Sequence, residues 1–149
     1  MAQTYIGSTL RTGSGTLTDT TDGGFVVVSQ TTTVTTVAAG TAVSSTITLP
    51  ASSQIINFFV DVVQLGVVGG GTATTIPVTI GTAAAGTQYL SSTDTISGGR
   101  VALTFTAAQL AAMANIGTSQ SVVITVDPNG TVSTTQSIIR LTVVYAQKV

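Results

Sequence analysis

Short segments in which apolar and polar residues alternate are the feature that most limits what this chain can fold into. A period of two places successive side chains on opposite faces of a β-strand. The strongest such segment is Gln54–Gln64. Its expected core face carries Ile56, Phe58, Val60 and Val62, and its opposite face carries Asn57, Asp61 and Val63. The segment is therefore predicted to be a strand with one face in a core.

Further segments of this kind follow along the chain, separated by Gly, Pro, Asn or Asp residues. The other expected strands are Phe25–Val28, Thr31–Val37, Ser44–Leu49, Ile76–Ile80, Gln88–Leu90, Val101–Phe105, Ser121–Val126 and Ser137–Tyr145. Phe25–Val28 is predicted to be buried, and Thr31–Val37 either continues it or forms an edge strand. Pro77 moves its strand toward a sheet edge, because proline donates no hydrogen bond to a ladder.

About eight short strands without βαβ alternation predict an all-β fold, either an antiparallel β-sandwich or a jelly roll. One segment breaks the period of two. Ala107–Ala114 spaces Leu110 and Met113 by three, which predicts one short helix over 107–114. Thr106 is its expected N-cap, and Gly117 lies just beyond its end.

The chain divides into an N-terminal arm, residues 1–24, and a β-sandwich domain, residues 25–149. The arm is polar and rich in glycine, and its apolar residues Tyr5, Ile6 and Leu10 show no sustained periodicity. Two interpretations stay open for this segment. It either becomes ordered when it docks on a partner, or it is a floppy terminus.

The composition removes most side chains that perform acid–base, nucleophilic or metal chemistry. The chain has no histidine, cysteine or glutamate, and its four basic and five acidic residues give a net charge of −1. A Ser-His or Cys-His nucleophile and a zinc site of the His/Cys type are therefore excluded. Four cations cannot build a basic patch, which argues against nucleic-acid binding. We expect no enzymatic activity and no cofactor.

The five aspartates are the remaining candidates for chemistry, in glycoside hydrolysis or calcium binding. They are Asp19, Asp22, Asp61, Asp94 and Asp127. Asp94 and Asp127 fall in expected turns, where a carboxylate bonds to the backbone, and no spacing matches an EF-hand loop. Asp61 lies in a strand, and its role is the least explained.

No run of residues reaches the length of about 18 apolar residues that a membrane helix needs. The first residues also lack the basic region of a signal peptide. We therefore expect a protein made in the cytoplasm that has no membrane partner.

Carbohydrate-binding surfaces usually rely on exposed aromatic side chains. This chain has no tryptophan, and Phe58, Phe105 and Tyr145 fall on expected core faces. Tyr5 and Tyr89 are the expected exposed aromatics, so a glycan platform has weak support.

The stretches Val78–Ala83 and Gly99–Leu110, the Met-Ala-Gln start and the Thr/Ser/Ala/Gly/Val-rich body resemble small virion proteins of tailed bacteriophages. The resemblance is nearest to the head decoration (cement) proteins. It covers roughly residues 50–147 and lies in composition and strand rhythm.

This resemblance implies a β-sandwich or jelly roll that binds the major capsid protein on the outside of the phage head. It implies a homotrimer that stabilises adjacent capsomers, and an N-terminal arm used for attachment. The location would be the virion surface, after synthesis in the host cytoplasm. No catalytic residue is carried over.

A capsid decoration protein is thus the leading hypothesis. The alternatives are another phage structural part, such as a head fibre, neck or tail protein, and a receptor- or glycan-binding β-sandwich module. The candidate interface residues are Tyr5, Ile6, Leu10, Arg11, Asp61, Arg100 and Arg140. The last three are expected to set the register of contacts within a neutral Thr/Val/Ala surface.

Overall fold

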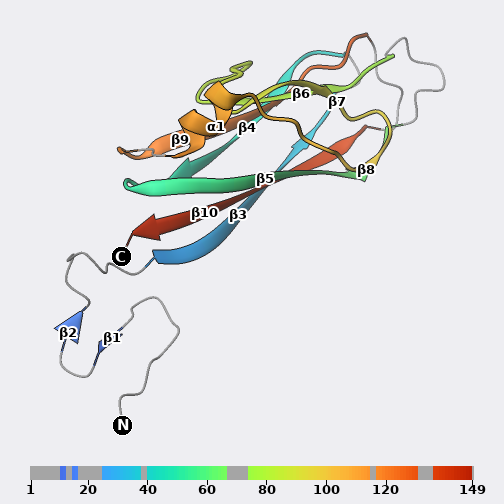
Figure 1. Cartoon of the computed structure of the whole chain (residues 1–149). Coiled ribbons are helices and arrows are strands. Elements are labelled where there is room, and N and C mark those ends of the chain that lie inside the picture. Colours follow the sequence, from blue (N-terminus) through green and yellow to red (C-terminus); the bar gives the residue numbers. More distant parts are fainter. Residues whose placement is uncertain are drawn as a thin grey trace.

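Two four-stranded antiparallel sheets form the body of the protein (Figure 1). The computed structural model describes residues 11–12, 15–16, 25–37, 40–66, 74–114, 117–130 and 136–148. The elements are β1 (Arg11–Thr12), β2 (Gly15–Thr16), β3 (Phe25–Thr35), β4 (Val43–Leu49), β5 (Ser53–Gln64), β6 (Pro77–Gly81), β7 (Leu90–Asp94), β8 (Gly99–Arg100), α1 (Ala107–Ala114), β9 (Gln120–Val126) and β10 (Ile138–Lys148). The predicted all-β sandwich with one short helix is confirmed.

In each four-stranded sheet the more buried strands take the inner positions and the less buried strands form the edges. Sheet I has the order β3-β10-β5-β8, and sheet II has the order β4-β9-β6-β7. Successive strands from β3 to β6 alternate between the two sheets, so the chain crosses repeatedly from one layer to the other. The inner strand β9 is buried at five consecutive residues, 122–126, because both of its faces are covered.

The core fills the space between the sheets with alternating side chains from both. The predicted inward row of β10 is buried: Ile139, Leu141, Val143 and Tyr145. The predicted row of β9 is buried as well: Val122, Ile124 and Val126. Each such side chain stabilises the fold by about 1.5–3 kcal/mol when it is fully buried. The alternation in the sequence therefore locates the core correctly in these strands.

The inward face of β5 differs from the prediction at one end of the strand. Ile56, predicted to lie in the core, is 51% exposed, and Ile55 is buried instead. Tyr145 pairs with Ile55 while Val144 pairs with Asn57, so Ile56 is an extra residue opposite β10. An extra residue of this kind is a β-bulge, and it changes which side chains face inward.

β6 is an inner strand, so the prediction that Pro77 marks a sheet edge is wrong. Pro77 is the first residue of the strand, a position where proline is tolerated in a sheet. Its carbonyl accepts a hydrogen bond of 3.1 Å from the Asp127 backbone N–H. The edges of sheet II are β4 and β7. β7 runs from Leu90 to Asp94, so only the last residue of the predicted strand Gln88–Leu90 lies in it.

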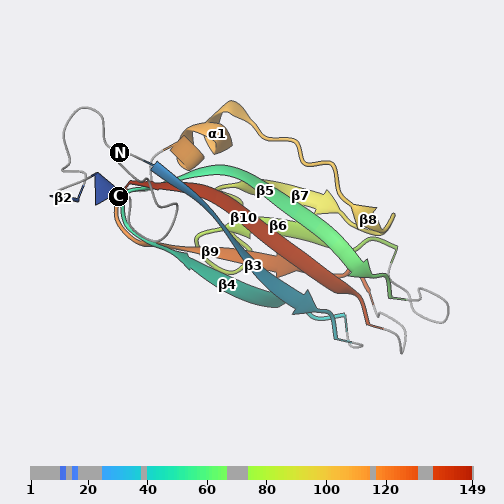
Figure 2. The same cartoon turned by 90° about the horizontal axis from the view of Figure 1, so that it is seen from below.

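The segment between β8 and β9 closes one lateral side of the sandwich (Figure 2). The prediction of a strand over Val101–Phe105 is wrong. The Val101 N–H donates to the Val60 carbonyl at 3.0 Å, but the rest of this extended segment pairs with no described strand. Val101, Leu103 and Phe105 nevertheless pack against the core. The alternation of these residues thus correctly predicts that they contact the core, but it wrongly predicts that they form a paired β-strand.

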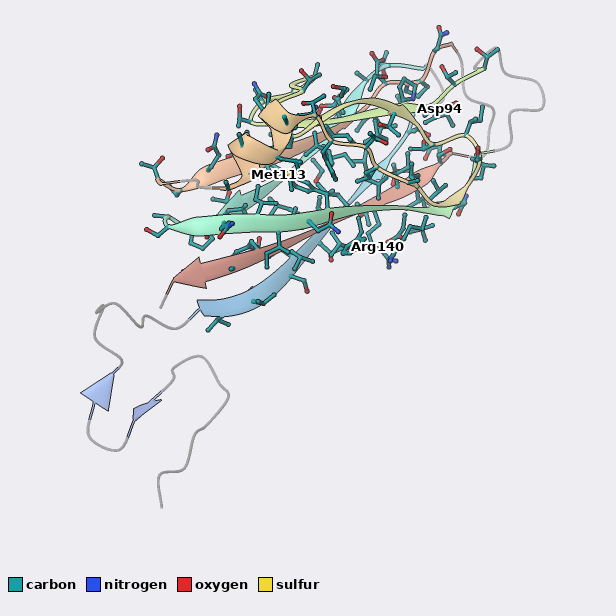
Figure 3. The ribbon with its side chains drawn as sticks, in the orientation of Figure 1. Asp94, Met113 and Arg140 are labelled. Carbon is teal, nitrogen blue, oxygen red and sulfur yellow. The ribbon has the colours of Figure 1, made fainter. Side chains whose placement is uncertain are left out.

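α1 spans the predicted residues, and Thr106 is its N-cap. Thr106 Oγ1 accepts a hydrogen bond from the Gln109 N–H at 3.3 Å, and Gln109 Oε1 accepts one from the Thr106 N–H at 2.8 Å. This reciprocal pair is a capping box. Met113 points between the sheets (Figure 3), whereas Leu110 is exposed, so Met113 shares the buried face with Gln109.

β3 contains both Phe25–Val28 and most of Thr31–Val37, so the second segment continues the first and is also an edge strand. The prediction that Phe25–Val28 is buried is wrong, because Val27 is 62% exposed and Val26 and Val28 are only half-buried. An edge strand with one face toward solvent buries every second side chain at most. Val34, near the other end of β3, is buried.

The described part of residues 1–24 consists of β1 and β2, which pair with each other and with neither four-stranded sheet. The attachment role of this arm stays a prediction.

Candidate functional site

The outward face of sheet I is built mostly from small neutral side chains. We define it by the residues of β3, β10, β5 and β8 that point away from sheet II. The exposed members on β3 are Val27, Ser29, Thr31, Thr33 and Thr35. Thr31 lies opposite Thr142 of β10, and their hydroxyl oxygens are 3.3 Å apart.

An ionic cluster lies across three adjacent strands of this face. Asp61 of β5 is paired directly with Arg140 of β10 on one side and with Arg100 of β8 on the other. Arg100 Nε donates to Asp61 Oδ1 at 2.8 Å and its Nη2 donates to Oδ2 at 3.2 Å. Arg140 Nη2 donates to the same Oδ2 at 3.3 Å. One carboxylate thus joins three strands.

The two arginines hold the carboxylate of Asp61 in its charged form. Hydrogen bonding to Arg100 is the largest cause that lowers the pKa of Asp61, partial burial opposes it, and Arg140 lowers it further. The Asp61 side chain is 14% exposed, while those of Arg100 and Arg140 are 61% and 45% exposed. The cluster therefore carries one net positive charge that faces solvent.

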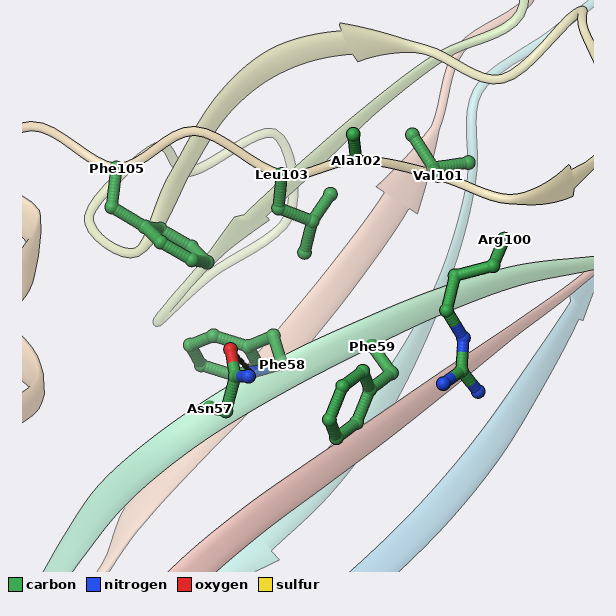
Figure 4. Close-up of a pocket in the computed structure, with 8 residues that line it drawn as sticks. All are labelled: Asn57, Phe58, Phe59, Arg100, Val101, Ala102, Leu103 and Phe105. Atoms are coloured by element: carbon green, nitrogen blue, oxygen red, sulfur yellow. Dashed lines mark hydrogen bonds between the residues drawn. The ribbon is translucent and has the colours of Figure 1, made fainter.

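A groove lies beside this cluster, between β5 and the extended segment that follows β8 (Figure 4). Its volume is about 320 Å³, and its lining residues are Asn57, Phe58, Phe59, Arg100, Val101, Ala102, Leu103 and Phe105. The guanidinium carbon of Arg100 lies 4.7 Å from the centre of the Phe59 ring, a cation–π contact. An amide, an aromatic ring and a guanidinium thus meet at one opening.

The groove exists because the ladder on this side of β5 is short. It pairs Asp61 with Arg100 and Val62 with Gly99, and the bond from Val101 to Val60 ends it. Farther along β5, the N–H of Phe58 donates to the side-chain oxygen of Asn57 at 2.8 Å. The side-chain oxygen of Asn57 thus accepts the hydrogen bond that the Phe58 N–H would otherwise donate to a longer β8.

The structure brings three of the predicted interface residues together: Asp61, Arg100 and Arg140. Tyr5, Ile6 and Leu10 lie outside the described residues. Arg11 lies in β1, where only the backbone is described.

Of the other described aspartates, Asp94 binds the backbone through its carboxylate, whereas Asp127 is held by its backbone. Asp94 Oδ1 accepts hydrogen bonds from the N–H groups of Ile76 at 2.8 Å and Ile96 at 3.2 Å. Asp127 contacts Pro77 through its own N–H, and Asp19 and Asp22 fall outside the described residues. In the described part of the chain, no three His, Cys, Asp or Glu side chains are grouped so as to hold a metal ion.

The groove residues Asn57 and Phe59 are absent from the residues predicted to form a site. Phe59 lies between Asn57 and Asp61 at a spacing of two, so the alternation of β5 was a usable signal for it. Tyr89, predicted to be exposed, is only 2% exposed and packs on Phe58 with ring centres 5.6 Å apart. Its burial raises the pKa of the Tyr89 hydroxyl.

A comparison with protein-family models, curated proteins and solved structures finds no match for this chain. Within the described residues, no helix has the length and apolar character needed to cross a membrane. A function for the chain therefore has to be argued from its own surfaces.

Proposed function

We propose that this chain is a structural virion protein, most specifically a decoration protein on the outside of a tailed-phage head. The observation that carries this proposal is the outward face of sheet I, where hydroxyl and small apolar side chains surround one internally paired ionic cluster. Outside the cluster this face can be buried against a partner without removing charge from water, which is costly. The face suits permanent contact with a shell.

The sequence resemblance supplies the partner in this proposal. The major capsid protein would contact the outward face of sheet I, and further copies of the chain would complete a trimer that stabilises adjacent capsomers. Within the same class, a head fibre, neck or tail protein would use the same neutral face on another part of the particle.

The experiment adds the purified protein to phage heads that lack decoration, and cryo-electron microscopy counts the bound copies and locates them. Thr142→Glu places a charge in the middle of the outward face of sheet I, opposite Thr31. We expect this variant to fold and to lose at least tenfold in occupancy. Thr46→Glu is the matched control, because Thr46 is an exposed threonine of β4 in sheet II.

Equal occupancy for Thr142→Glu and the unmodified protein would contradict contact through sheet I. No bound copies of the unmodified protein on the head would contradict decoration itself. Density at the neck or tail would instead assign the chain to another structural part.

The groove favours a second candidate function, a receptor- or glycan-binding module. Its opening combines the ring of Phe59 with the amide of Asn57 and the guanidinium of Arg100, which together offer a stacking surface and polar groups for sugar hydroxyls. A glycan array would test this function directly. Binding that Phe59→Ala abolishes, and that the matched variant Val63→Ala on the same strand retains, would support it. An array without signal would remove this candidate.

A further inference from the structure

β3 is an edge strand that lacks the usual protection against pairing with another strand. It has eleven residues, and the segment FVVVSQTTTVT contains no charge, proline or glycine. Its ladder with β10 runs without a register shift from Phe25 to Thr35. Natural edge strands are normally short, charged, bulged, covered or broken by proline. β3 is long, uncharged and free of proline and bulges, and no other strand in the described part of the chain pairs with its second edge.

The opposite edges of the two sheets are protected. β8, the other edge of sheet I, has two residues and carries Arg100. β7, the matching edge of sheet II, has five residues, and its ladder with β6 shifts register. Gln109 of α1 also donates to Ser91 Oγ of β7 at 3.0 Å. Because the edges at β7 and β8 are protected, pairing with another chain is expected on the opposite side of the sandwich, where β3 lies.

The hydrogen bonds show which backbone groups of β3 are available. The Thr36 N–H donates to the Ser137 carbonyl at 2.9 Å, in phase with the ladder that pairs Thr35 with Ile138. In an antiparallel strand the N–H and C=O of one residue point to the same side, and successive residues alternate. Even-numbered residues of β3 therefore face β10, and odd-numbered residues from Phe25 to Thr35 face the free edge.

We propose that β3 pairs antiparallel with β3 of a second copy of this chain across a twofold axis near Gln30. The contact joins two copies of sheet I into one continuous eight-stranded sheet, four strands from each copy. About this axis Val27 lies opposite Thr33 of the other copy, and Ser29 lies opposite Thr31. Both pairs consist of odd-numbered residues, so backbone donors meet acceptors and side chains on the outward face stay on that face.

We infer that the pairing strand comes from a second copy of this chain, because two antiparallel β3 edges match each other in hydrogen-bonding groups and in charge. No charge is repeated across the axis, so identical strands meet without repulsion. The exposed side chain of Val27 and the half-buried side chains of Val26 and Val28 would lose water contact on pairing. Apolar burial and backbone pairing thus act together at one contact.

This inference goes beyond the proposed function. The contact is twofold, whereas the resemblance implies a threefold one, and it uses the edge of sheet I and not its face. A chain with both contacts would form a hexamer, and a chain with the edge contact alone would form a dimer.

Mass in solution, measured by sedimentation equilibrium on the full chain over a range of concentrations, tests the proposal. Thr31→Pro removes an N–H that faces the free edge and leaves the bonds between β3 and β10 in place. We expect the mass of this variant to be half that of the unmodified protein, with unchanged circular dichroism. Thr31→Val is the matched control, since it removes the hydroxyl and keeps the N–H, and it should keep the full mass.

A second variant covers the case in which Thr31→Pro fails to fold. Thr31→Lys places like charges near the axis and should also halve the mass. A monomeric or trimeric unmodified protein would overturn the proposal, as would a folded Thr31→Pro variant of full mass. Half mass for Thr31→Val would overturn it too, because the hydroxyl and not the backbone edge would then carry the contact. Occupancy on phage heads is a separate measurement, so the proposed function stands or fails independently.

Discussion

Asp61 links three strands of sheet I through two arginines, although the strands are far apart in the sequence. Arg100 and Arg140 are 39 and 79 residues away along the chain. Because all three side chains lie at directly paired positions, a slip of one residue between these strands would break the cluster. The cluster therefore favours one register between these strands. The Thr, Ser and Val side chains around it are too alike to favour one register over another.

The first prediction concerns the pH dependence of this cluster. Asp61→Asn should lower the free energy of unfolding by about 1 kcal/mol or less at neutral pH, as for other surface ion pairs. The folded pKa of Asp61 is lowered, so its contribution is complete above the ordinary carboxyl pKa of about 3.9 and disappears as the pH falls through the lower folded value.

Urea unfolding of both proteins over a series of pH values measures this contribution. The stability difference should stay constant from neutral pH to about pH 4 and then shrink. A difference that disappears between pH 7 and pH 5 would contradict the assignment to Asp61.

The sequence singled out Asp61, Arg100 and Arg140 but did not predict that they meet. Their contact depends on β5 having β10 and β8 as neighbours, which no local pattern specifies. The same limit explains Tyr89, because its ring contact is with Phe58 of β5, a strand that is distant in the sequence. Residue type indicates which side chains form ion pairs or ring contacts, whereas the order of strands in the sheets determines which residues are near enough to be their partners.

Among the elements, α1 is the one whose local signals and structure agree most closely. Its capping box gives it a defined start, and Met113 attaches it to the core. Gln109 has a second role, since its Nε2 donates to the Thr87 carbonyl at 3.2 Å. The start of the helix is thereby connected to the segment before β7.

The second prediction tests this capping box. Thr106→Ala should lower the free energy of unfolding by about 1 kcal/mol, the usual cost of losing a threonine cap. Chemical denaturation measures the change. Thr104→Ala is the matched control, because Thr104 is exposed and lies two residues earlier in the chain. Equal effects of the two substitutions would contradict a specific role for the cap.

The strands show where periodicity stops being informative. It located β4 and β10 closely, because burial alternates along each of them, and it located β9 although that strand is buried on both faces. It was wrong at Ile56, where the bulge is created by the register with β10. It was also wrong for the pairing of Val101–Phe105, since a buried alternating segment has the same pattern with or without a partner strand.

At the scale of the whole molecule, the two lateral sides of the sandwich differ. The extended segment 101–106 and α1 close one side, and on the other side the long strand β3 has β10 as its one described strand neighbour (Figure 2). The outward face of sheet I lies between these sides, and its described charges are gathered in the cluster of Asp61, Arg100 and Arg140. Apart from this cluster, the described residues of the face are neutral, and so is the edge strand β3.

The third prediction follows from this neutrality. Attachment to phage heads should be nearly independent of salt, because there are few ion pairs for added ions to screen. Counting bound copies at low salt and at about 1 M NaCl measures the effect; screening is almost complete at the higher concentration. Release by moderate NaCl alone would contradict attachment through the neutral face.

The position of β10 also determines when this protein can fold during its synthesis. β10 comes last in chain order among the described strands, yet it lies in the middle of sheet I, with β3 on one side and β5 on the other. Until it emerges, β3 and β5 have no strand between them, and the apolar rows that face sheet II stay uncovered. Sheet I of the nascent chain therefore cannot be completed before β10 has been translated, and during that interval β3 and β5 remain open to unwanted pairing with other chains.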